Sequence, residues 1–262
     1  MVEILTRDLA ERRRSLIAYS AGLALYVVFV VAVYPAFKDS TSLDALTSGN
    51  PGLSAMFGIS GSITSPVGWI SANIYANFFP LVILLLTIGY GAQSLAGQEE
   101  DGHLELVLSL PFSRRAVVIQ KAGAMTIQAT VLGAVVLLAT LCGRFFELTI
   151  PTAHLATATL GVVLLAIDFG LIAMAIGAGT GARALAVGVT TAVAAASYLI
   201  SSLAPVVHAL DPLRYTSLFY WAIGDNQLDN GLTWLSVVVL VGAGLLAAVT
   251  TTILFDRHDL RA

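Results

Sequence analysis

The chain has 262 residues, of which 57% are hydrophobic and only 11% are charged, and its mean hydropathy is +0.87. Ordinary soluble domains carry about 25% charged residues, so this composition excludes a soluble globular protein. The formal net charge of −3 does not predict the topology, because acidic residues hardly affect it. We expect no nucleic-acid partner.

Six apolar stretches are long enough to cross a bilayer, since about 20 apolar residues make one helical span. They cover approximately residues 15–37, 71–97, 117–143, 154–179, 184–207 and 233–255. A closed barrel would instead show short segments of alternating polarity. The sequence therefore predicts an all-α membrane protein with six transmembrane helices in a single domain.

Lysine and arginine are distributed unevenly between the two sides of the predicted membrane. If the N-terminus lies inside, ten of the 13 basic residues are cytoplasmic and only Lys38, Arg144 and Arg214 are outside. This positive-inside excess predicts that both termini are cytoplasmic.

Residues 1–14 precede the first span and have an amphipathic pattern. Ile4, Leu5 and Leu9 recur at roughly helical spacing, with charged residues between them. Such a segment can lie in the plane of the lipid headgroups. We therefore expect an interfacial helix whose basic end anchors the first span.

The second span carries three unusual residues in its outer half, namely Asn73, Asn77 and Pro80. The two asparagines are one turn apart and share a helix face, and the proline should kink the helix. Polar groups in a membrane helix face protein or a wet cavity. The asparagines either bridge neighbouring helices or lie, together with Pro80, on a substrate path.

A cytoplasmic segment, residues 98–112, connects the second and third spans. It begins with three consecutive acids, continues with several leucines and stops at Pro111, which is the pattern of a short helix. Its apolar side could press into a groove of another protein. The alternative is a linker that faces lipid and has solvated acids.

Asp168 is the one acid in the middle of a predicted span. Placing a carboxylate there costs about 2.5–3.5 kcal/mol on insertion scales, so we expect it to face the interior of the bundle. Two roles compete. Asp168 either attracts a cationic substrate or carries a proton, or it fixes neighbouring helices by hydrogen bonds.

The outer segment, residues 208–231, joins the fifth and sixth spans. Tyr215, Phe219, Tyr220 and Trp221 precede a polar stretch within it. Aromatic side chains at headgroup depth are typical of an interfacial helix, so we predict an interfacial or re-entrant segment here.

The connecting segment resembles a known family. The pattern Glu-Glu-x-Gly-x-Leu-Glu-x-x-Leu-x-x-Pro-x-x-Arg occupies residues 99–114 and resembles the cytoplasmic loop of ABC type-2 export permeases. The resemblance extends over nearly the whole chain and includes the six-span plan. The arginines at 12–14, Tyr34-Pro35 and Ser65-Pro66 are most similar to actinobacterial permeases associated with antibiotic or multidrug export.

The resemblance implies that residues 98–112 form a coupling helix, which sits on a separate nucleotide-binding subunit. The acids would meet basic or polar groups of that subunit, the glycine would permit a turn, and the proline would end the helix. The residues implied at this contact are Glu99, Glu100, Gly102, Leu104, Glu105, Leu108, Pro111 and Arg114.

The chain lacks the sequence signatures of a motor or an enzyme. It contains no Gly-x-x-x-x-Gly-Lys-Ser/Thr phosphate loop and no HExxH, CxxC or GxSxG motif. After six spans, no cytoplasmic segment is long enough for an ATPase domain of ordinary size. We therefore expect ATP and Mg²⁺ to bind to the partner, and this chain to hold no cofactor and no metal.

The function implied is the membrane half of an ATP-driven exporter in the bacterial plasma membrane. Two permeases, identical or homologous, would enclose a path for a hydrophobic small molecule, such as a drug, an antibiotic or a lipid-like compound, in contact with membrane lipid. The alternatives are a self-contained secondary transporter or channel that uses Asp168, and a scaffold for membrane assembly.

Overall fold

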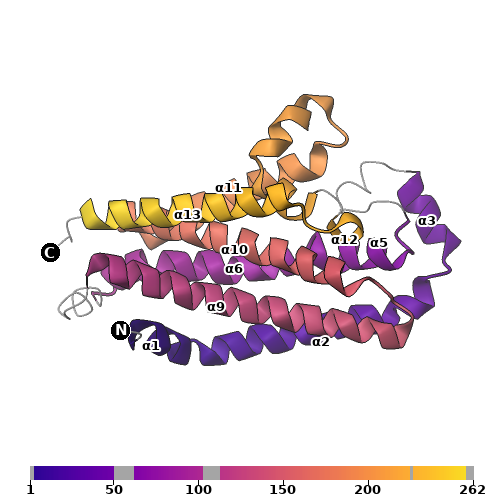
Figure 1. Ribbon diagram of the computed structural model, residues 1–262, viewed down its shortest axis with the longest axis horizontal. Helices are drawn as coiled ribbons and strands as arrows, with labels where there is room; N and C mark the ends of the chain where they lie inside the picture. The colour runs from indigo at the N-terminus through magenta and orange to yellow at the C-terminus, as the bar shows by residue number, and fades with distance from the viewer. Residues whose placement is uncertain (1–2, 50–61, 103–112, 225–226, 258–262) are drawn as a thin grey trace.

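The computed structural model describes residues 3–49, 62–102, 113–224 and 227–257. Long helices run side by side along one axis, and both ends of the described chain lie at the same end of the bundle (Figure 1). The described residues form helices and connecting turns, with no strand among them. The predicted all-α class is therefore confirmed.

Six helical segments are long and apolar enough to cross a membrane, as predicted. Their bounds are Arg13–Phe37, Pro66–Glu100, Arg114–Phe146, Thr152–Thr180, Arg183–Leu203 and Trp234–Arg257. The first, fourth, fifth and sixth are the single helices α2, α10, α11 and α13. The third consists of α9 (Arg114–Leu141) and a 3-10 turn, η3 (Cys142–Phe146).

The second span is interrupted. It consists of α5 (Pro66–Ile70), the π-helical turn η1 (Ser71–Tyr75), α6 (Phe78–Ala92), a second π-helical turn η2 (Gln93–Gly97) and α7 (Gln98–Glu100). The irregular backbone lies at Asn77, which has φ −128° and ψ −72°. Pro80 therefore lies in the first turn of α6, where its missing N–H breaks no hydrogen bond of that helix. The predicted break is present, but it precedes the proline.

Shorter helices lie at the two ends of the bundle. The helix α1 (Glu3–Glu11) packs against α9 at the end that carries both termini, and α3 (Thr41–Ser48) and α12 (Gln227–Asn230) lie toward the opposite end (Figure 1). The 3-10 helix η4 (His208–Thr216) follows α11 and stands out from the side of the bundle, and the π turn η5 (Tyr220–Gly224) leads back to it.

The central helix is α10, which packs against α6, α9, α11 and α13. Small residues allow this close packing. A Cβ added to Gly91 of α6 would lie 2.1 Å from the carbonyl oxygen of Gly170 in α10. Membrane helices associate through such small residues because their backbones can then come into van der Waals contact.

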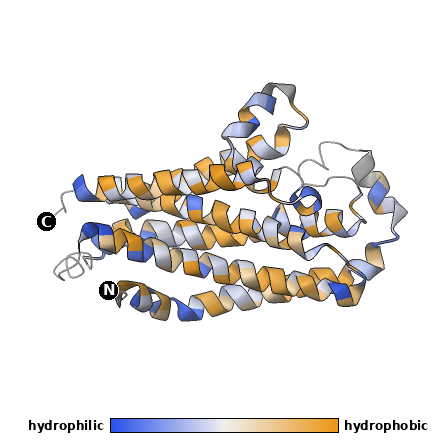
Figure 2. Cartoon of the chain, in the orientation of Figure 1, coloured by the Kyte–Doolittle hydropathy of each residue, from blue (hydrophilic) through white to orange (hydrophobic). Residues whose placement is uncertain are grey.

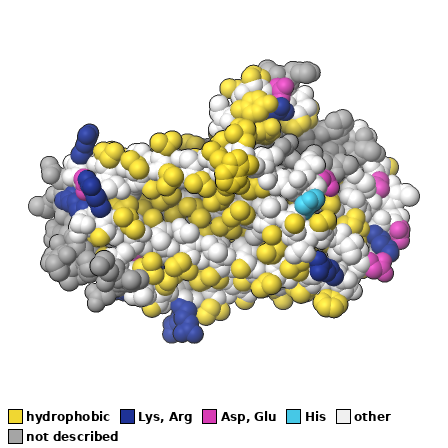
Figure 3. Space-filling view, viewed as in Figure 1, with side chains coloured by type: hydrophobic (Ala, Val, Ile, Leu, Met, Phe, Trp, Pro, Cys, Tyr) yellow, Lys and Arg dark blue, Asp and Glu magenta, His cyan; other side chains and the backbone are white. Residues whose placement is uncertain are grey.

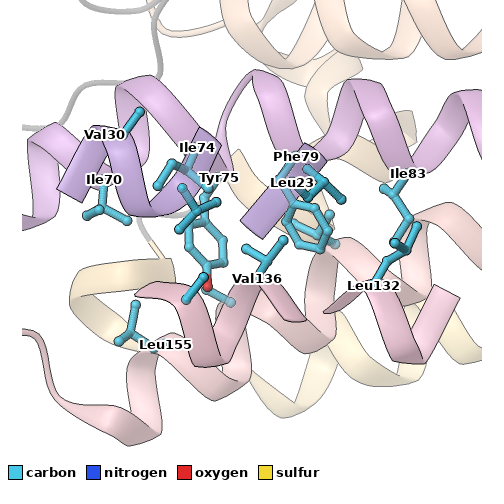
Figure 4. Close-up of a cluster of buried hydrophobic side chains, with 14 of the residues drawn as sticks. Leu23, Val30, Ile70, Ile74, Tyr75, Phe79, Ile83, Leu132, Val136 and Leu155 are labelled. Atoms are coloured by element: carbon cyan, nitrogen blue, oxygen red, sulfur yellow. The ribbon is translucent and has the colours of Figure 1, made fainter. Parts of the chain in front are cut away.

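The largest buried cluster lies between α2, the second span, α9 and α10, as Figure 4 shows. Tyr75 is 2% exposed and its hydroxyl forms a hydrogen bond of 2.8 Å with Thr159 Oγ1 of α10. Phe79 lies next to it toward α9 in the same view. The aromatic rings fill the space between the helices, and the buried hydroxyl of Tyr75 has a hydrogen-bond partner.

The surface of the bundle has the polarity expected of a membrane protein. Hydrophobic residues run along the long helices, and hydrophilic residues gather toward the helix ends (Figure 2). Hydrophobic side chains also cover the middle of the face shown in Figure 3, with most basic and acidic side chains near the two ends. Exposed leucines and valines on α11 and α13, such as Leu199 and Leu246, continue this apolar surface.

One polar cluster lies at the end of the bundle opposite the two termini (Figure 1). Asp44 of α3 accepts hydrogen bonds from the Ser62 hydroxyl at 2.6 Å and from the Thr64 hydroxyl at 2.8 Å. It also accepts a longer one, 3.4 Å, from the Thr64 amide. These hydrogen bonds lower the pKa of the Asp44 carboxyl below its usual value. The carboxylate therefore ties α3 to the start of the second span.

Candidate functional site

A cavity of about 670 Å³ lies between α6 and α11. Tyr26 of α2 and Phe219, which follows η4, also line it. The lining residues within the described part of the chain include no charged side chain, and the polar ones are Tyr26, Asn73, Asn77, Thr191 and Tyr198. Pockets for small ligands have volumes of about 300–1,000 Å³ and are mostly apolar with a few polar groups. This cavity has both properties.

Three of the four residues predicted on a substrate path line this cavity, namely Asn73, Asn77 and Pro80. The side-chain amide of Asn73 donates a hydrogen bond of 2.9 Å to the carbonyl of Trp69. The side-chain amide of Asn77 donates one of the same length to the carbonyl of Ala72. Both amides thus bind carbonyls of the irregular backbone around η1, and both side chains are only half-buried.

Two tyrosines connect neighbouring helices to this irregular segment. The hydroxyl of Tyr198 on α11 donates a hydrogen bond of 2.8 Å to Asn77 Oδ1. The hydroxyl of Tyr26 on α2 donates one of 3.0 Å to the carbonyl of Asn73. Asn77 therefore bridges two helices, which was one alternative drawn from the sequence, and it also lines the cavity.

Two pairs of aromatic rings line the cavity. Tyr26 packs against Phe78 with ring centroids 3.8 Å apart and ring planes tilted by 31°. Tyr198 meets Phe219 edge to face at 5.4 Å. The sequence pointed to neither tyrosine as a site residue. The polar residues Thr191 and Tyr198 lie in an alanine-rich span, where no charge or proline drew attention to them.

Asp168, the fourth predicted residue, does not line this cavity. It is 2% exposed and lies between α10 and α13. A Cβ added to Gly244 of α13 would lie 2.6 Å from Asp168 Oδ1. The other carboxyl oxygen, Oδ2, has no hydrogen-bond partner among the described residues. The structure thus separates Asp168 from the three residues of the second span.

The residues implied at a partner contact are described only in part. Leu104, Glu105, Leu108 and Pro111 lie outside the described residues. Glu99, Glu100 and Gly102 come directly before that gap, and Arg114 lies just after it. Gly102 has a φ of 68°, a left-handed conformation that favours glycine. The chain therefore turns after α7.

The acids before the gap contact the turn between α10 and α11. Glu100 Oε1 accepts a hydrogen bond of 2.9 Å from the backbone amide of Arg183, at the start of α11. A carboxylate is favourable at this position because the first amides of a helix have no partner within it. The carboxylate of Glu99 packs against Gly181, which has a φ of 64°. These contacts attach the entrance of the connecting segment to α11.

The residues after the gap contact the end of α13. Arg114 donates a hydrogen bond of 2.6 Å to the carbonyl of Phe255, and its guanidinium lies 5.4 Å from the centre of the Phe255 ring. Arg115 forms an ion pair of 3.4 Å with Asp256. Both ends of the connecting segment are thus attached to the ends of other spans.

No group of three or more His, Cys, Asp or Glu residues that could hold a metal ion occurs among the described residues.

The profile of one protein family, described as ABC-2 family transporter protein, matches residues 2–260. None of the curated proteins compared with the chain matches it.

Proposed function

Because the chain belongs to the ABC-2 transporter family and is a multi-pass protein of the bacterial plasma membrane, we propose that it is the permease subunit of an ATP-binding cassette exporter. In this role it moves hydrophobic or amphipathic molecules outward, either drugs and antibiotics or lipid-like compounds. A separate ATPase subunit supplies the energy, and a second permease, identical or homologous, completes the path.

The observation that carries this proposal is the cavity between α6 and α11. Its volume of about 670 Å³ suits a small organic molecule, and its lining has aromatic and aliphatic side chains without a charge. Asn77 and Tyr198 offer hydrogen-bonding groups at one side of the cavity. An amphipathic substrate can place its apolar part against Leu81 and Leu84, which also line the cavity, and its polar part against these groups.

The connecting segment is the proposed binding site of the ATPase subunit. Glu99, Glu100 and Arg114 hold its two ends against α11 and α13. A force on the segment would therefore reach two spans besides those it connects. Direction requires that the inward-open and outward-open states bind the substrate with different affinities, because a ligand shifts an equilibrium only through such a difference.

Charge reversal in the connecting segment tests the proposal. The protein should copurify with an ATPase subunit. Glu105→Arg should remove that subunit, because a positive charge at this position would repel the basic groups of the partner. The matched control is Glu11→Arg, which reverses an exposed acid of α1 outside the segment. If both variants retain the subunit, or if both lose it equally, the connecting segment is not its specific binding site.

A further inference from the structure

A buried ion pair joins three helices at the cytoplasmic end of the bundle. Asp8 Oδ2 of α1 accepts a hydrogen bond of 2.6 Å from the hydroxyl of Tyr90 on α6. The same oxygen accepts one of 3.4 Å from the Lys121 ammonium on α9. Lys121 and Tyr90 are each 1% exposed. One carboxylate oxygen therefore contacts two helices at once, away from water.

Further contacts hold α1 in this position. Gln120 Oε1 of α9 accepts hydrogen bonds from the backbone amides of Ile4 and Leu5, at 3.2 and 3.5 Å. These amides lie in the first turn of α1 and have no partner within their own helix. The guanidinium of Arg12 lies 4.6 Å from the centre of the Tyr90 ring. The helix α1 is thus bound to the bundle by polar contacts as well as by its apolar face.

The ion pair connects the two helices that lie before and after the connecting segment. Tyr90 lies on the helix that leads into the connecting segment, and Lys121 lies in the second turn of the helix that leads out of it. Asp8 bridges the two. A side chain of α1, which packs against α9 (Figure 1), therefore ties the base of the incoming helix to the base of the outgoing helix, in addition to the direct contact between α6 and α9.

We propose that Asp8 is a positioning residue, which clamps the two helices that flank the connecting segment so that movement of the segment reaches the cavity. This inference rests on the proposed function, because it assigns the clamp a part in coupling the ATPase to the permease. A buried ion pair is weak evidence for stability, since desolvation can cancel the attraction between the charges. Its defined geometry is the property that a coupling device needs.

The test requires a reporter in the cavity that does not depend on knowing the substrate. Cys142 is the one cysteine of the chain, so Cys142→Ser gives a background without cysteine. Thr191 lines the cavity on α11, and Thr191→Cys there accepts a polarity-sensitive fluorophore. In the complete complex with the ATPase subunit, ATP should shift the emission of this fluorophore as the cavity changes its access to water.

In the Asp8→Asn background we expect the ATPase subunit to remain bound and the ATP-dependent emission shift to fall by at least half. The matched control is Glu11→Gln, which neutralises an acid on the exposed side of the same helix and should leave the shift unchanged. Tyr90→Phe removes only the hydroxyl donor and should reduce the shift to a smaller extent. A full emission shift in Asp8→Asn would overturn the proposal.

A double variant separates positioning from mere stability. Asp8→Asn alone leaves the Lys121 charge buried without its partner, whereas Asp8→Asn together with Lys121→Met removes both charges. The double variant should recover the resistance of the complex to unfolding but not the emission shift. Recovery of both would show that the ion pair is only structural. A reporter chain with Asp8 intact that binds no ATPase or shows no shift with ATP would overturn the proposed function itself, together with this role of Asp8.

Discussion

The close contact between α6 and α10 predicts opposite behaviour for two glycines on the same helix. A Cβ at Gly91 would lie 2.1 Å from the carbonyl oxygen of Gly170, whereas a Cβ at Gly89 would meet no atom within 4 Å. Contacts of a Cβ atom shorter than 3.0 Å essentially never occur, so Gly91→Ala must push the two helices apart by about 1 Å. Gly89→Ala requires no movement.

The magnitude follows from the cost of overpacking. Adding a methyl group to a well-packed site costs about 1–3 kcal/mol, and alanine gains about 0.5–1 kcal/mol over glycine within a helix. Both variants receive the gain, so the difference between them isolates the clash. We expect Gly91→Ala to unfold more easily than Gly89→Ala by about 1–3 kcal/mol, or roughly a 5- to 150-fold difference in the unfolding equilibrium constant.

Equilibrium unfolding of the two purified variants in detergent, followed by circular dichroism, measures this difference. The natural chain serves as the reference, and Gly89→Ala should equal or exceed its stability. If Gly91→Ala proved as stable as Gly89→Ala, α6 and α10 would not approach each other at Gly91, and the packing around α10 would need revision.

Three further predictions concern single side chains. Asp168→Asn keeps the shape of the side chain and lies outside the cavity, so ATP-dependent transport should persist; loss of transport with the complex intact would favour a proton or cation role. Tyr198→Phe removes the hydrogen bond to Asn77 and should cost about 0.6 kcal/mol in detergent unfolding, the average for such bonds in membranes. A cost near zero would mean that the bond does not form. Because its folded-state pKa is lowered, Asp44 should stabilise the contact between α3 and the start of the second span above about pH 4 and lose this effect at lower pH. In the natural chain, the protection of the Thr64 amide against hydrogen exchange, corrected for the intrinsic pH dependence of exchange, should fall at low pH. If protection fell in the same way in Asp44→Asn, the titrating group would not be Asp44.

The sequence predicted the six spans because long apolar runs leave a chain few alternatives in a bilayer. It also drew attention to Asn73 and Asn77, whose spacing places them on one helix face. It did not reveal that Tyr198, more than a hundred residues away, donates a hydrogen bond to Asn77. Such a contact depends on how α6 and α11 pack, and periodicity within one helix does not contain that information.

Two charged residues show the same limit of sequence patterns. Lys121 counted among the cytoplasmic charges that set the topology, and the structure buries it against Asp8. Their separation of 113 residues hides the pair from any local pattern. Asp168, like the two asparagines, is a polar group in a membrane span, but the structure places it against Gly244 on α13. A hydropathy pattern shows that a polar group should face inward, but it does not show toward which neighbour.

The central claim is that this chain forms a transport path that works only when a separate ATPase drives it. The most direct test compares proteoliposomes that contain the permease alone with proteoliposomes that contain the complete complex, using a panel of hydrophobic fluorescent dyes. We predict that at least one dye accumulates when both subunits and ATP are present, and that none accumulates with the permease alone. Equal accumulation by the permease alone, with or without a proton gradient, would contradict the account.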